Sequence, residues 1–201
     1  MNKLQKTAKG LDSLFKFAYR ISMVGIVISC IAIAIMWLLY LGDPDILDLL
    51  QTDLNFGMIK FTLADSVEPA NHFGFLYLAL GSIISIADVI VFCMIFHAIR
   101  GILAPLKEGR PFHDDIVHYL KKLGWLTIVG GIITNLGTLV ISGNLLPAYN
   151  LGELFLSDKI TRVSTSYSFS LTFILYAVIL FLLSWIFEYG GELQQLSDET
   201  L

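Results

Sequence analysis

One acidic residue, Asp88, lies where acidic residues are rarely tolerated. It occurs inside the apolar run 73–99, and a carboxylate in the middle of a lipid-embedded helix costs roughly 2.5–3.5 kcal/mol on insertion scales. Such a residue can bind a proton or an ion during transport, or it can be an acid that is hydrogen-bonded to neighbouring helices. Because this depth holds one acid and no basic partner, we favour the structural role and keep the ion site as the alternative.

The position of Asp88 along its run indicates which polar residues it could bond. Counting about 1.5 Å per helical residue from the middle of each apolar run places Ser29 and Tyr176 close to the depth of Asp88. Asn135 comes out further toward the opposite side of the membrane, nearer Ser85. We therefore predict a hydrogen bond from Asp88 to Tyr176 or Ser29, since a bond to Asn135 would need a tilted helix.

The remaining reactive side chains form no pattern that indicates catalysis. His113, Asp114 and His118 could bind a metal ion, but two histidines five residues apart do not share one face of a helix. The sequence contains no nucleophile elbow, phosphate-binding loop or zinc-protease helix. We predict a protein without a metal site, a cofactor or an enzymatic activity.

Four long apolar runs are the elements that must position these residues. The chain has 201 residues, of which 56% are hydrophobic and 15% charged, whereas about a quarter of the residues in soluble domains are charged. A helix needs about 20 apolar residues to cross the core of a bilayer. The runs that meet this requirement are 19–41, 73–99, 119–141 and 166–187. The predicted fold class is an all-α membrane protein with four transmembrane helices surrounded by membrane lipids.

Small and polar residues recur at helical spacing along one stripe of each run. Gly124, Gly131 and Asn135 are one example, at steps of seven and four residues. Small residues allow helices to approach closely in lipid, where no hydrophobic force drives them together. We therefore expect the stripes to face inward, and residues 1–201 to form a single four-helix domain.

The distribution of Lys and Arg predicts the orientation of the chain. Five of them precede residue 21 and another five lie within 100–122, whereas the segment 42–72 contains only Lys60 against six Asp and Glu. Loops rich in Lys and Arg stay in the cytoplasm, so both termini and the middle loop are predicted to be cytoplasmic. The net charge of −4 argues against direct contact with nucleic acid.

The segments outside the apolar runs have local patterns of their own. Residues 1–16 alternate lysines with apolar residues, which is typical of a short amphipathic helix on an anionic leaflet. Pro105 is expected to end or kink the second helix. Residues 56–63 and 154–164 resemble strands, and we expect these two loops to pair into a small extracytoplasmic cap.

Two cytoplasmic motifs carry a resemblance to a known family. The middle loop contains Gly-x-Pro-Phe, from Gly109 to Phe112, and the C-terminal end contains Gly-x-x-Leu-Gln-x-x-x-Asp-x-Thr, from Gly190 to Thr200. Together they resemble an uncharacterised bacterial family of four-helix membrane proteins. Genes of that family often lie beside one for a small Cro/C1-type helix-turn-helix regulator. The resemblance thus implies a bacterial inner membrane and such a cytoplasmic regulator as partner, and it implies no activity.

These two motifs are also the predicted docking surface for a cytoplasmic partner. The middle loop is basic and the tail is acidic, so we expect the tail to continue as a helix beyond Gly190 and to fold toward the loop. Phe112, Leu193 and Leu196 are expected to supply the apolar contact between them. We predict a membrane-bound signalling or regulatory subunit, with a small transporter using Asp88 as the alternative. The residues assigned to the docking surface are Gly109, Arg110, Pro111, Phe112, Gly190, Leu193, Gln194 and Asp198.

Overall fold

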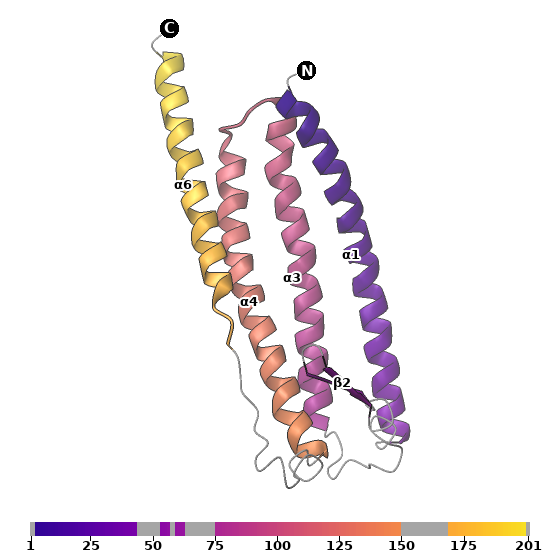
Figure 1. Cartoon of the computed structure of the whole chain (residues 1–201). Coiled ribbons are helices and arrows are strands. Elements are labelled where there is room, and N and C mark those ends of the chain that lie inside the picture. Colours follow the sequence, from indigo (N-terminus) through magenta and orange to yellow (C-terminus); the bar gives the residue numbers. More distant parts are fainter. Residues whose placement is uncertain (1–2, 44–52, 57–58, 63–74, 150–168, 200–201) are drawn as a thin grey trace. The chain divides into compact units, whose positions relative to one another are not determined.

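Four long helices dominate the structure, a computed structural model that describes residues 3–43, 53–56, 59–62, 75–149 and 169–199 (Figure 1). Each helix is long and apolar enough to cross a membrane. The predicted all-α fold with four membrane-spanning helices is therefore confirmed, and the chain is a multi-pass membrane protein. The elements in chain order are α1 (Lys3–Gly42), β1 (Asp53–Phe56), β2 (Ile59–Thr62), α3 (Phe75–Glu108), α4 (Asp114–Tyr149) and α6 (Thr172–Glu199).

The chain divides into two compact units, and three of the helices contribute to both. The first unit consists of Met1–Val27, Ala87–Thr134 and Ser170–Leu201, so it contains all of α6. The second unit consists of Ile28–Ile86 and Asn135–Phe169. Whether residues 1–201 fold as a single domain stays a prediction, and each unit is described in turn.

In the first unit, α4 and α6 pack antiparallel through glycines and aromatic rings. The side chain of Phe173 lies against Gly131, and the side chain of Phe181 lies against Gly124. Ala177 and Ser184 of α6 are 1% and 0% exposed. A larger residue at either glycine would collide with the ring beside it, so these glycines confirm the expectation that small residues allow close packing in the spans.

The start of α1 differs from the separate amphipathic helix predicted for residues 1–16. The helix begins at Lys3 and runs without interruption to Gly42. Asp12 accepts hydrogen bonds from Lys107 Nζ at 2.7 Å and from Arg100 Nε at 3.4 Å, and the Arg100 guanidinium lies 5.9 Å from the ring centroid of Tyr19. These contacts with α3 attach the start of α1 to the bundle.

The prediction that Pro105 ends or kinks the second helix is wrong about where the helix ends, because α3 continues to Glu108. Pro105 lies in the last turn, where only the hydrogen bond to the Gly101 carbonyl is lost. The helix ends in a Schellman motif: Arg110 N donates to Pro105 O at 3.0 Å, and Gly109 N donates to Leu106 O at 3.2 Å. Gly109 has φ of 80°, a left-handed conformation that favours glycine.

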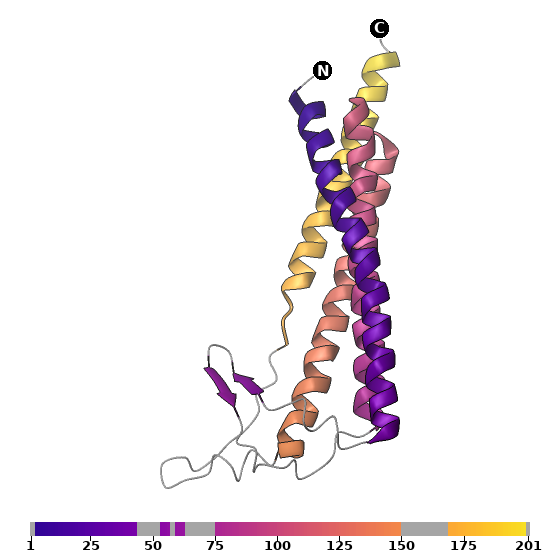
Figure 2. The ribbon, with the colours of Figure 1, turned by 90° about the vertical axis from the view of Figure 1, so that its right-hand side faces the viewer.

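The second unit contains a short β-hairpin, which the sequence analysis did not predict. β1 and β2 pair antiparallel, with Asp53 opposite Thr62 and Phe56 opposite Ile59 (Figure 2). The predicted strand over residues 56–63 corresponds mainly to β2, and its partner is β1, which lies directly before it in the chain. The strand predicted within 154–164 lies outside the described residues.

Candidate functional site

The connection between α3 and α4 is a short structured turn. After the glycine cap at Gly109, the chain passes through Pro111 and Phe112 to His113, and α4 begins at Asp114. His113 Nδ1 accepts a hydrogen bond from Asp115 N at 3.2 Å, so it caps one of the free N–H groups of the helix start. Each end of the turn is thus fixed by hydrogen bonds, and Phe112 is held between them.

Phe112 packs directly on the backbone of α6. A methyl group built on Gly190 would lie 2.5 Å from Phe112 Cε1, and the ring centroids of Phe112 and Phe187 are 5.9 Å apart. Because α6 continues as helix through Gly190 and Gly191 to Glu199, the prediction that the tail is helical and lies beside the loop is confirmed. Phe112 remains 40% exposed.

One ion pair joins the two segments. Lys121 Nζ of α4 donates to Glu188 Oε2 of α6 at 2.9 Å, which realises the expected attraction between the basic loop region and the acidic tail. Arg110 of the loop forms a local contact with Glu108, and His113 lies beside Asp115. Side chains of the Lys121–Glu188 pair are 43% and 48% exposed, so the pair contributes at most about 1 kcal/mol, and it orients the two helices more than it stabilises them.

A hollow surface, here called the loop–helix groove, lies between the turn and the last turns of α6. It consists of two pockets of about 420 and 240 Å³ that share Phe112, Gly191 and Gln195. Carboxylates outnumber cations along its walls. The other lining residues are Asp114, Val117, His118, Lys121, Phe187, Glu188 and Glu192 in the larger pocket, and Gly109, Arg110, His113, Gln194 and Asp198 in the smaller one.

The structure brings together most of the predicted docking residues. Five of them line the groove: Gly109, Arg110, Phe112, Gln194 and Asp198. Gly190 supports the ring of Phe112, and Pro111 lies next to it in the turn.

The apolar contact expected between the turn and both Leu193 and Leu196 is not found, whereas the docking role of Leu193 stays a prediction. The two leucines are 50% and 60% exposed and are not among the residues that line the groove, because the face of α6 toward the turn is occupied by Gly191, Gln194 and Gln195. The sequence contained a signal for the correct face. Residues 188, 191, 192 and 195 follow the i, i+3, i+4, i+7 spacing of one helical face.

The polar residues of the spans are less closely associated than predicted. Asp88 is half-buried, whereas Tyr176 is 57% exposed, and within the described part of the first unit no hydrogen bond joins them. The prediction of an Asp88–Tyr176 bond is therefore wrong. Ser29, Ser85 and Asn135 belong to the second unit, where Asn135 is buried and Ser85 exposed, and their relation to Asp88 stays a prediction.

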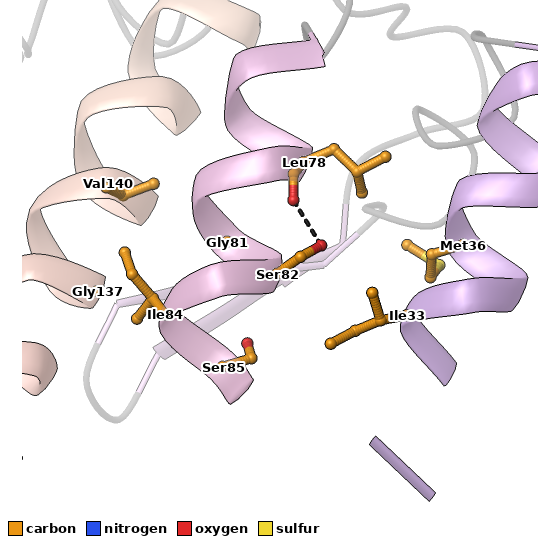
Figure 3. A pocket seen from close by; sticks show the side chains of 9 residues that line it. All are labelled: Ile33, Met36, Leu78, Gly81, Ser82, Ile84, Ser85, Gly137 and Val140. Carbon is orange, nitrogen blue, oxygen red and sulfur yellow. Dashed lines mark hydrogen bonds between the residues drawn. The ribbon is translucent and has the colours of Figure 1, made fainter. Parts of the chain in front are cut away.

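A separate pocket of about 250 Å³ lies in the second unit, between α1, α3 and α4 (Figure 3). One of its two hydroxyls is hydrogen-bonded within the protein: Ser82 Oγ donates to Leu78 O at 2.7 Å and accepts from Trp37 Nε1 at 3.3 Å. The pocket is lined by Ile33, Met36, Leu78, Gly81, Ser82, Ile84, Ser85, Gly137 and Val140. No charged side chain is among these described residues.

The loop–helix groove and both motifs fall within residues 61–201, and this range matches the family described as "Protein of unknown function (DUF2975)". The chain belongs to this family. No curated protein and no solved structure matches it. The matched range includes α3, α4 and α6 but not α1, so all the segments that build the groove lie within it. Among the described residues, no group of three or more His, Cys, Asp or Glu is placed to hold a metal ion.

Proposed function

We propose that this member of the DUF2975 family is a regulatory subunit of a bacterial inner membrane that docks a cytoplasmic protein in the loop–helix groove. Both termini and the groove lie on the cytoplasmic side in this proposal. The excess of Lys and Arg before residue 21 and within 100–122 supports this orientation, because such residues are retained in the cytoplasm.

The observation that carries the proposal is the convergence of two polar motifs outside the predicted spans. A connection between two transmembrane helices needs only a short turn, and a helix end needs only a cap. Instead, Phe112 and the Gly190–Gly191 pair build a hollow with carboxylates, amides and two histidines on its walls. Exposed polar loops that a rigid scaffold holds in place are where binding residues concentrate.

The partner that we propose is a small helix-turn-helix regulator, as the family resemblance implies. Held at the membrane, such a regulator would be kept away from chromosomal sites until a change in the bundle releases it. The net charge of −4 supports a protein partner, since direct binding to nucleic acid needs a basic surface.

Affinity capture from native membranes tests this proposal. Gln195 lines both pockets of the groove, so Gln195→Arg is expected to block the groove and abolish capture of the regulator. Ser197→Arg introduces the same side chain on the same helix, at a residue that does not line either pocket, and it should leave capture unchanged. Equal capture by the two variants would place the docking site elsewhere.

The alternative function, a small transporter that uses Asp88, rests on that one residue. The pocket in the second unit is lined by apolar side chains and two serines, and Asp88 is not part of it. Four helices with a single acid in the spans also offer no pair of broken helices of the kind that forms transporter sites. Docking is therefore the function that we prefer.

A further inference from the structure

The last turns of α6 carry an apolar stripe that the bundle leaves uncovered. Tyr189, Leu193 and Leu196 are 63%, 50% and 60% exposed, and the residues around them are glycine, Glu, Gln and Ser. These three residues follow the predicted span 166–187, so lipid chains do not account for their exposure. Apolar surface that stays exposed outside the hydrocarbon indicates an interaction site.

The stripe continues in register into the membrane-spanning part of α6. Exposed apolar residues recur at alternating steps of four and three residues, which is the a/d repeat of a coiled coil. At 1.5 Å per residue, the repeat extends for about 33 Å along the helix. The residues in the stripe are Leu175, Ile179, Leu182, Ile186, Tyr189, Leu193 and Leu196.

The identities of these residues indicate how many helices would associate. Ile179, Ile186 and Leu193 occupy the a positions, and the d positions are leucines apart from Tyr189. A β-branched residue at a, with Leu at d, favours two parallel helices over three or four. The pattern therefore indicates a partner helix that runs in the same direction as α6.

The side of α6 opposite to the stripe is already occupied. Ala177 and Ser184 are 1% and 0% exposed, and Gly191, which follows at the same seven-residue step, lines the loop–helix groove. All three are f positions of the repeat, which point away from a and d. A partner on the stripe would thus leave the groove open.

We propose that a second copy of this chain covers the stripe, so that the protein is a parallel dimer through α6. The matching helix must cross the membrane and also continue beyond it, and α6 of a second copy does both. Copies in one membrane have the same orientation, so their α6 helices are parallel about a two-fold axis along the membrane normal. The charges permit this pairing, because Glu192 at g would face Ser197 at e of the second copy, and not another carboxylate.

Cysteine cross-linking of the full chain in native membranes tests the dimer. In a background with Cys30→Ser and Cys93→Ala, single Leu193→Cys or Leu196→Cys variants are oxidised and the covalent dimer is measured. Dimer yield is expected to exceed that of Gln195→Cys by about fivefold or more, since a and d side chains meet across a parallel coiled coil whereas c positions diverge. Gln195 is likewise exposed and lies one residue from Leu196, on the side of α6 that lines the groove.

A second measurement leaves the native cysteines in place. The mass of the wild-type protein in nanodiscs is expected to correspond to two copies, and Leu193→Glu with Leu196→Glu should reduce it to one, while Gln194→Glu with Gln195→Glu should not. Equal cross-linking at residues 193, 195 and 196, or a one-copy mass for the wild-type chain, would overturn the dimer. So would a cross-link at Leu193 to a different protein in place of a second copy.

Discussion

The ring of Phe112 occupies the space where any side chain on Gly190 would have to lie. The separation of 2.5 Å between a methyl group built at Gly190 and Phe112 Cε1 is far below van der Waals contact, so the turn and α6 can approach this closely only because residue 190 is a glycine. This contact connects the two motifs, and the shape of the groove therefore depends on residue 190 having no side chain.

Gly190→Ala is expected to open the groove and to be less stable than the control Gly10→Ala. Alanine in a helix normally gains about 0.5–1 kcal/mol over glycine, but here the methyl group must displace Phe112 from Phe187, and such an aromatic pair contributes about 0.5–1.5 kcal/mol. The measurement is the midpoint of thermal unfolding in detergent, together with partner capture. Gly10→Ala is the matched control, because nothing lies within 4 Å of the added group, and it should stabilise slightly. An equal rise in both variants would show that Phe112 moves without cost.

Hydropathy predicted the four helices correctly because the cost of burying polar groups in lipid acts along every span. It did not predict where the helices end. Asp12 is a polar residue among lysines, and only its contact with Lys107 and Arg100 of a distant segment shows why α1 has no break before residue 19. The hydrogen bonds that end α3 at Gly109 likewise depend on a glycine conformation that local composition indicates only weakly.

The contact between loop and tail was predicted at the level of segments, and less well at the level of single residues. The loop was assigned to one side from its charge and the tail to the same side from the number of spans, and the Phe112–Gly190 contact agrees with this placement. Leu193 was expected to supply an apolar contact between loop and tail, but the glycines at 190 and 191 let the turn pack on their side of α6. The leucines were consequently left on the exposed stripe. The predicted bond between Asp88 and Tyr176 failed because depth alone does not determine the direction of a side chain around a helix.

Asp88→Asn is expected to leave expression, membrane insertion and groove function nearly unchanged, because the amide keeps the polar character of a half-buried side chain. Asp88→Leu should be tolerated as well if the carboxylate has no role in transport. Expression level, thermal unfolding in detergent and regulator capture are the measurements. If Asp88→Asn abolishes a cellular activity while the protein unfolds at the wild-type temperature, the transporter alternative replaces docking.

Reporter fusions test the proposed orientation of the chain. Fusions after Gly10, His72, Glu108, Asn150 and Thr200 are expected to report cytoplasm, outside, cytoplasm, outside and cytoplasm, because Lys and Arg gather in the first and third of these segments. Alkaline phosphatase and a fluorescent protein give complementary signals at each site. A periplasmic signal at Glu108 would invert the orientation and remove the groove from any cytoplasmic partner.

Exchanging the charges of Asp12 and Lys107 tests whether α1 is attached to α3 outside the spans. Asp12→Lys would bring a third cation next to Lys107 and Arg100, so the start of α1 is expected to detach and become sensitive to protease. The double variant Asp12→Lys with Lys107→Asp should recover most of the resistance, and the recovered coupling should be about 1 kcal/mol or less for a partly exposed pair.

The same ion pair predicts how the resistance depends on pH. The pKa of the Asp12 carboxyl, which lies before the span 19–41, is lowered first by the hydrogen bond from Lys107 and then by Arg100. The stabilisation is therefore present above the ordinary pKa of an aspartate and is lost as the pH falls through the lowered folded-state pKa. Protease resistance of the wild type should consequently be constant between about pH 5 and 8. A double variant as sensitive as Asp12→Lys alone would show that the packing of α1, and not this ion pair, holds the two helices together.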